Sequence, residues 1–131
     1  MSRHIALISA TFATACATVA PAGPVVGQWG GPHIGVTLTS SGGSIEYDCA
    51  SGSLSEPIVP GPDGDFQAQG THTPGHGGPA IEGDILPVHR VRFTGKVRGD
   101  RMTLTGRVEN GVLLGPFDLS RGAESGIFRC L

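Results

Sequence analysis

The chain has 131 residues, which is enough for one domain with one modest hydrophobic core. Charged residues make up only 15% and the formal net charge is -2, so the composition lacks the strongly basic balance of a nucleic-acid-binding protein. The 22 glycines and 10 prolines lie between short apolar alternations, a distribution typical of an all-β protein.

The amino terminus has the pattern of a secretory signal peptide. A short positive start, residues 1–4, precedes an uncharged stretch from Ile5 to Val19 in which small residues increase towards the end. This stretch is too short for a membrane span, which needs about 20 apolar residues. We therefore expect a signal peptide over residues 1–15, cleaved near Ala15 or as late as Ala20, then a tether over 16–26 and one domain over 27–131.

The segment Ala13-Thr14-Ala15-Cys16 resembles the lipobox of bacterial lipoproteins, in which the cysteine is diacylated. It departs from that pattern at Ala13, where leucine is usual. The resemblance implies a lipid anchor through Cys16, and an ordinary cleaved signal is the alternative. In either case we expect export, to the periplasm, to the outer membrane as a lipoprotein, or to the medium.

From residue 27 onward, apolar and polar residues alternate with a period of two, and turn residues separate the runs. The first strand is predicted from His33, with residues 28–31 as an extension across a kink at Pro32. A strong turn is expected at 61–64, and the Asn110-Gly111 dipeptide favours a hairpin. The pattern predicts strands over residues 33–39, 44–49, 53–59, 65–73, 88–97, 101–108, 112–119 and 126–131.

Eight strands, each joined to the next, predict an antiparallel up-and-down β-barrel, and a two-sheet β-sandwich is the alternative. If the strands alternate in direction, Cys49 and Cys130 end strands at the same rim. A disulfide between them is then feasible in an oxidising compartment and would contribute about 2–4 kcal/mol. Small residues with inward parity (Gly35, Ala68, Gly70, Gly95 and Gly106) leave open whether the barrel is hollow or filled.

The segment Gly27-Gln28-Trp29, at the start of the first strand, resembles the Gly-x-Trp signature of lipocalins and related calycin barrels. The resemblance implies a lipocalin-like barrel in which Trp29 plugs the closed end. The carboxy-terminal helix usual in lipocalins is missing from the pattern. The chain also resembles small exported β-proteins of bacteria.

Histidines gather around the longest interruption of the strand pattern, residues 74–87. His72 and His89 flank this loop with inward parity, and the strand order places His33 at the same rim. His76, Glu82 and Asp84 lie on the loop itself. Neutral imidazoles with a carboxylate suit zinc or copper, whereas the simpler interpretation is half-buried, hydrogen-bonded histidines. We predict no obligatory cofactor, with a divalent metal as the open alternative.

Charge is unevenly distributed along the chain. No Lys or Arg occurs between His4 and His89, whereas eight bases against four acids follow from Arg90 onward. The parity of the strands turns Arg90, Arg92 and Lys96 outward, in a stripe that continues through Arg101 and Arg107. This stripe either faces an anionic envelope surface or balances the acidic first half of the chain, which is the simpler interpretation.

The segment His76-Gly77-Gly78 is similar to the oxyanion-hole segment of some esterases, but the Gly-x-Ser-x-Gly elbow of such enzymes is missing. We therefore predict a non-catalytic envelope protein that binds a small molecule or an envelope protein at the barrel rim near residues 74–87, and that binds no nucleic acid. Two alternatives are a periplasmic enzyme inhibitor that inserts this loop into a cleft, and a divalent-metal-handling protein that uses the rim histidines.

Overall fold

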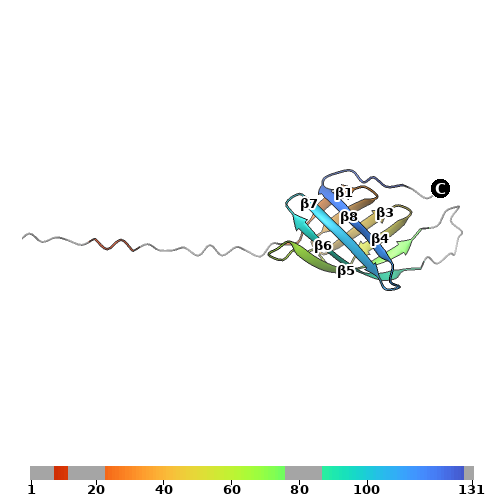
Figure 1. Cartoon of the computed structure of the whole chain (residues 1–131), viewed down its shortest axis with the longest axis horizontal. Helices are drawn as coiled ribbons and strands as arrows, with labels where there is room; N and C mark the ends of the chain where they lie inside the picture. Colours follow the sequence, from red (N-terminus) through yellow and green to blue (C-terminus); the bar gives the residue numbers. More distant parts are fainter. Residues whose placement is uncertain (1–7, 12–22, 76–86, 129–131) are drawn as a thin grey trace, which may run out of the picture.

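The computed structural model describes residues 8–11, 23–75 and 87–128, and within these ranges the regular structure is entirely β (Figure 1). Short alternating runs form the strands because each buries one face and exposes the other. The strands are β1 (Gly27–Gly31), β2 (Ile34–Thr39), β3 (Gly42–Tyr47), β4 (Ala50–Leu54), β5 (Asp65–Pro74), β6 (His89–Arg98), β7 (Arg101–Val108) and β8 (Leu113–Arg121).

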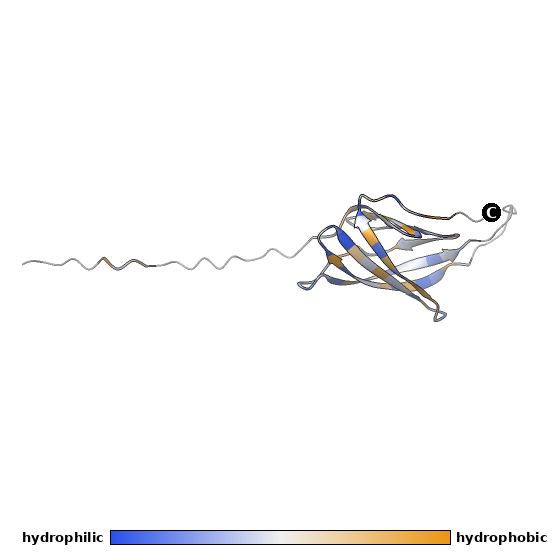
Figure 2. Ribbon diagram, turned by 45° about the horizontal axis from the view of Figure 1, so that its top comes forward, coloured by the Kyte–Doolittle hydropathy of each residue, from blue (hydrophilic) through white to orange (hydrophobic). Residues whose placement is uncertain are grey.

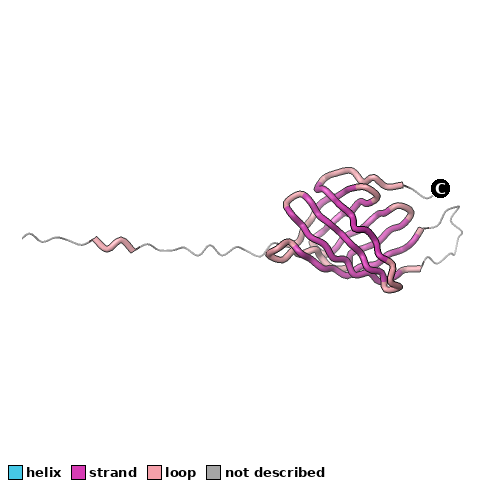
Figure 3. The backbone as a smooth tube through the Cα atoms, in the orientation of Figure 1, coloured by secondary structure: helices cyan, strands magenta, loops and turns pink. Residues whose placement is uncertain are grey.

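Each strand pairs antiparallel with the next, and β8 pairs with β1 to close the barrel. This confirms the predicted up-and-down barrel and excludes the two-sheet sandwich. The barrel has two rims, which can be followed in Figure 3. The entry rim is the end at which β1 begins and β8 finishes. The loop rim is the opposite end, and it carries the β1–β2, β3–β4, β5–β6 and β7–β8 connections.

Two predicted strands were wrong, although the count of eight is right. The expected strand over 33–39 with its extension is two strands, β1 and β2, joined by a tight turn at Pro32 and His33. His33 adopts a φ of 69°, a left-handed conformation that is uncommon for a residue other than glycine. The expected strand over 126–131 is not formed by its described residues: Gly126 makes one isolated parallel bridge with Pro32.

The third predicted strand, 53–59, is displaced towards the amino terminus. Strand β4 covers Ala50–Leu54 and ends before Pro57, which has no N–H for the strand ladder. Ile58 is buried all the same, and its carbonyl accepts a 2.8 Å hydrogen bond from the Val25 N–H. The segment after β4 therefore packs against the chain that enters the barrel.

The barrel interior is apolar, and among the described residues no polar or charged residue is fully buried. Figure 2 shows hydrophobic and hydrophilic residues alternating along the strands, as inward and outward positions require. The buried residues are Trp29, Ile34, Val36, Leu38, Ile45, Tyr47, Leu54, Ile58, Phe66, Ala68, Val91, Phe93, Met102, Leu104, Val108 and Leu119.

Two phenylalanine rings occupy the space that inward glycines leave. A Cβ at Gly95 would lie 2.7 Å from Phe66 Cζ, and one at Gly70 would lie 2.7 Å from Phe93 Cε2. A Cβ at Gly106 would lie 3.0 Å from Phe93. The glycines of β5, β6 and β7 therefore match aromatic side chains, and the interior is filled at this level.

After β8 the chain crosses the outside of the barrel as a C-terminal strap, residues 122–128, which runs from the entry rim to the loop rim (dark blue in Figure 1). It starts at a hydrogen bond of 2.7 Å from the Gly122 N–H to the Gln28 carbonyl. Gly35, expected inward, instead faces outward beneath the strap, where a Cβ would lie 2.6 Å from Ser125 Cβ. A close approach of strap and barrel thus depends on glycine at this position.

Candidate functional site

The loop rim brings His72 and His89 together. The two are direct partners in the β5–β6 ladder, so their side chains share the inward side of the sheet. Both are half-buried, whereas the neighbouring positions deeper in the barrel are fully buried. This agrees with the placement expected from the alternation. His89 Nδ1 also lies 3.5 Å from Glu109 Oε1 in the β7–β8 connection.

Tyr47 joins this pair and was not among the predicted site residues. It is the last residue of β3, and it is 6% exposed. Its ring meets the His72 ring edge-on, with centroids 5.6 Å apart at 64°. The Phe117 ring also lies near Tyr47, with ring centroids 5.6 Å apart at an angle of 31°. The inward parity of Tyr47 at a strand end was the available sequence signal, but the pairing needs the closed barrel.

Two polar atoms in this cluster are buried without a hydrogen-bond partner: Tyr47 Oη and His72 Nδ1. Such groups are rare in native proteins, and each costs about 1–3 kcal/mol when it is left unsatisfied. An unexplained unsatisfied group of this kind points to an unobserved water or ligand. A phenol donates a hydrogen bond and a neutral imidazole nitrogen accepts one, so the pair can hold a group that both accepts and donates.

Burial shapes the protonation of both side chains. It raises the pKa of the Tyr47 phenol well above its ordinary value, so the hydroxyl keeps its proton and stays a donor. Burial, with a smaller contribution from the neighbouring His89, lowers the pKa of His72. His72 is therefore neutral at pH 7, the state in which an imidazole can accept a hydrogen bond or bind a metal.

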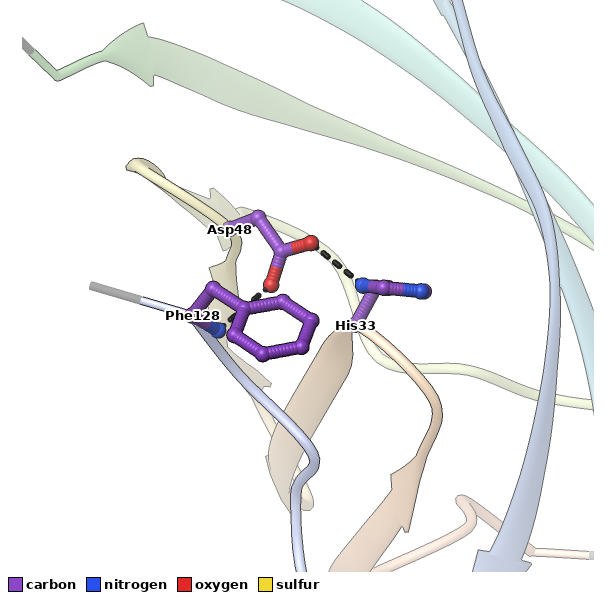
Figure 4. A network of polar contacts seen from close by, with 3 residues as sticks. All are labelled: His33, Asp48 and Phe128. Atoms are coloured by element: carbon purple, nitrogen blue, oxygen red, sulfur yellow. Dashed lines mark hydrogen bonds and ion pairs between the residues drawn. The ribbon is translucent and has the colours of Figure 1, made fainter. Parts of the chain in front are cut away.

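His33 lies at the loop rim too, but it is engaged in a different arrangement (Figure 4). Its Nδ1 contacts the Asp48 carboxylate, whose other oxygen accepts a 2.7 Å hydrogen bond from the Phe128 N–H. The Phe128 ring lies 5.4 Å from the His33 ring. The Asp48 carboxylate, in the β3–β4 turn, therefore links the β1–β2 turn to the end of the C-terminal strap.

A three-histidine metal set is therefore not assembled by His33, His72 and His89. No group of three or more His, Cys, Asp or Glu side chains within residues 8–11, 23–75 and 87–128 is close enough to hold a metal ion. His76, Glu82 and Asp84, the other expected contributors, lie outside the described residues.

Cys49 sits in the β3–β4 turn with a φ of 57° rather than at the end of a strand. Its N–H donates a 3.2 Å hydrogen bond to the Phe128 carbonyl. Cys130, its expected disulfide partner, lies outside the described residues, as do Cys16 and residues 1–7. Among the described residues, no helix is long and apolar enough to cross a membrane.

At the entry rim, Trp29 is buried and pairs directly with Arg121 of β8. The guanidinium carbon of Arg121 lies 4.5 Å from the centre of the indole ring. Arg121 is held there by a 3.0 Å hydrogen bond from its Nε to Asp100 and by a second bond to the Val26 carbonyl. The indole ring of Trp29 thus has a cation over its face, and its expected role as a plug of the barrel end stays a prediction.

The outer wall carries a separate groove of about 480 Å³ beneath the C-terminal strap. Its lining is mainly polar and includes Glu46 of β3 and Glu124 of the strap. The sheet separates this groove from the inward-facing rings of Tyr47 and His72, because the exposed Glu46 and the buried Tyr47 are successive residues of β3. It was not anticipated from the sequence.

Comparison with family models, with curated proteins and with solved structures found no match for this chain. The closed eight-stranded barrel is compatible with the lipocalin-like architecture that Gly27-Gln28-Trp29 suggested.

Proposed function

We propose that the protein is an exported, non-catalytic binding protein whose ligand site is the loop-rim cluster of Tyr47, His72 and His89. One observation carries this proposal: a phenol hydroxyl and an imidazole nitrogen, on rings in edge-on contact, are both buried without a partner. A ligand that forms hydrogen bonds with both atoms removes the free-energy cost of burying them without partners.

The chemistry of the cluster favours a small planar molecule with a polar edge. The rings of Tyr47, His72 and Phe117 offer flat apolar surfaces, which stack well against aromatic groups. The Tyr47 hydroxyl donates to a carbonyl oxygen, and neutral His72 accepts from an N–H. An aromatic carboxamide has this combination of plane, acceptor and donor.

Export is part of the proposal and is supported by the signal-like amino terminus and by Cys49. The Cys49 N–H binds the carbonyl of Phe128, which is two residues before Cys130 in the sequence. A disulfide between these cysteines suits an oxidising compartment such as the periplasm. Lipidation at Cys16 and kinship with lipocalins remain proposals on the residues quoted above.

Benzamide is a minimal probe of this site, because it is uncharged and carries an acceptor beside a donor. We expect its titration to shift the amide resonances of Tyr47, His72 and Phe117. Tyr47→Phe or His72→Phe should weaken binding roughly fivefold each, the equivalent of one hydrogen bond of about 1 kcal/mol. His33→Gln, a change at the same rim but outside the cluster, should leave the affinity unchanged. Shifts confined to the groove beneath the strap would refute the site.

Metal binding is a second candidate, favoured by the direct cross-strand pairing of His72 and His89. Two imidazoles in register supply half of a tetrahedral zinc shell. Zinc at 100-fold over its dissociation constant should then stabilise the fold by about 2.7 kcal/mol. His89→Gln should abolish the thermal shift and His33→Gln should not. No shift with zinc, copper or nickel at neutral pH excludes this candidate.

A further inference from the structure

The outer face of the β6–β7 hairpin is strongly basic. Outward positions on these strands carry six cations, the basic face, and five of them are exposed while Lys96 is half-buried. With a rise of roughly 3.3 Å per residue, this face runs for about 26 Å along the strands. Its members are Arg90, Arg92, Lys96, Arg98, Arg101 and Arg107.

The register places like charges against each other. Arg92 pairs directly with Arg107, and Arg98 pairs directly with Arg101. Like charges directly opposite in a sheet repel and destabilise it. The simpler interpretation of the charge asymmetry, that the basic half is balanced by the acidic half, does not hold for these two pairs.

The arginines of the basic face have no carboxylate partners among the described residues. Among the described residues, Lys96 pairs with Asp65 at 3.6 Å and Arg121 pairs with Asp100. The other two ion pairs are those of His33 with Asp48 and His89 with Glu109. Acidic groups nearby are few: Asp118 lies opposite Thr103, and Glu109 faces His89. Five guanidinium groups are therefore available for an external anion.

Exposed apolar side chains adjoin one end of the basic face. Val88 precedes β6 and is 61% exposed, and Leu113, the direct partner of Arg107, is 57% exposed. Val112 beside it is 51% exposed. A row of cations that ends in exposed apolar residues is the composition of a surface that lies at a lipid interface, where phosphates meet acyl chains.

We propose that the basic face and its apolar end, Val88, Val112 and Leu113, dock the barrel on an anionic lipid surface. The guanidinium groups bind headgroup phosphates, each bidentate where geometry allows. The apolar side chains enter the boundary between headgroups and acyl chains. This goes beyond ligand binding at the Tyr47–His72 cluster, whose rings face the barrel interior.

Sedimentation with phosphatidylglycerol-containing vesicles tests this proposal, with pure phosphatidylcholine vesicles as the neutral comparison. The wild type should bind the anionic vesicles and release them between 0.1 and 1 M salt, because the screening length falls from about 10 Å to about 3 Å. Arg92→Thr with Arg107→Thr should weaken binding roughly 25-fold, about fivefold per arginine, given about 1 kcal/mol for each basic residue near such a surface.

The same double variant should melt at the wild-type temperature or above it, because it removes a repulsive pair. Thr37→Glu with Ser40→Glu makes the same change in net charge on another part of the barrel, and it should bind nearly as the wild type does. Val112→Ser with Leu113→Ser should weaken binding while retaining its salt dependence. The proposal would be overturned if the Thr37/Ser40 variant lost as much vesicle binding as the Arg92/Arg107 variant. It would also be overturned if the protein bound soluble polyphosphate but not vesicles.

Discussion

Tyr47 and His72 meet edge to face at the loop rim, 5.6 Å apart between ring centres, and each buries a polar atom that has no hydrogen-bond partner. The buried residues of the described barrel are hydrophobic, and the rings of Phe66 and Phe93 fill the space beside its inward glycines. Among the described residues, the buried side-chain atoms without a hydrogen-bond partner are Tyr47 Oη, His72 Nδ1 and the Trp29 indole nitrogen. The first two lie together, where a ligand can satisfy both at once.

The Arg121 cation over Trp29 should stabilise the entry rim. Arg121→Ala removes the cation–π contact, the hydrogen bond to Asp100 and the bond to the Val26 carbonyl, and we expect a loss of about 1–2 kcal/mol in the free energy of unfolding. Trp29 is the chain's one tryptophan, so its fluorescence reports the change directly. Asp100→Asn is the control: with its side chain 82% exposed, it should cost no more than about 0.5 kcal/mol.

Filling the barrel further should destabilise it. Gly95→Ala places a methyl group against the Thr103 carbonyl oxygen and 2.7 Å from Phe66 Cζ, and crowding of this kind costs about 1–3 kcal/mol. Thr94→Ala, at the neighbouring outward position, should change the free energy of unfolding by less than about 0.5 kcal/mol. Urea denaturation of both variants measures the difference. Equal stability of Gly95→Ala and wild type would mean that the Thr103 backbone and the Phe66 ring both yield to the added methyl group, which would contradict a tightly packed interior.

Stability should fall in mild acid because of His72. Burial and the neighbouring His89 lower the pKa of His72 in the folded state, so the unfolded chain binds a proton more readily. This contribution to stability is complete above the unfolded pKa of about 6.5 and is lost as pH falls towards the folded value. Melting temperatures at pH 7.5 and 5.0 should differ more for wild type than for His72→Phe. If the melting temperature fell equally in both proteins between pH 7.5 and 5.0, His72 would not be the source of the acid sensitivity.

Cys49 and Cys130 should form a disulfide. The Cys49 N–H already binds the carbonyl of Phe128, two residues short of Cys130 in the sequence. The denatured, unreduced mature protein should show no reactive thiol from either position, and reduction should cost about 2–4 kcal/mol. Two reactive thiols from these positions would rule the bridge out.

Alternation alone was enough to predict the closed barrel and the meeting of His72 and His89, because parity and strand direction fix which residues share a rim. The turn at His33 was missed, since the groups that contact this left-handed histidine, Asp48 and Phe128, are distant in the sequence. The alternation predicted a strand over 126–131, but the pairing of β8 with β1 leaves no free edge to receive its described residues, 126–128. The Tyr47–His72 contact joins β3 to β5, which are not adjacent strands, so it could not be predicted from residue spacing along the chain.

The proposed ligand site is tested most sharply by the free energy of unfolding of Tyr47→Phe in the absence of any ligand. If the hydroxyl is buried without a partner, its removal should stabilise the protein by about 1 kcal/mol. The same variant should bind benzamide more weakly, so stability and binding should move in opposite directions. A Tyr47→Phe protein that is less stable than wild type, measured by urea denaturation, would show that the hydroxyl is already satisfied and would contradict the proposed site.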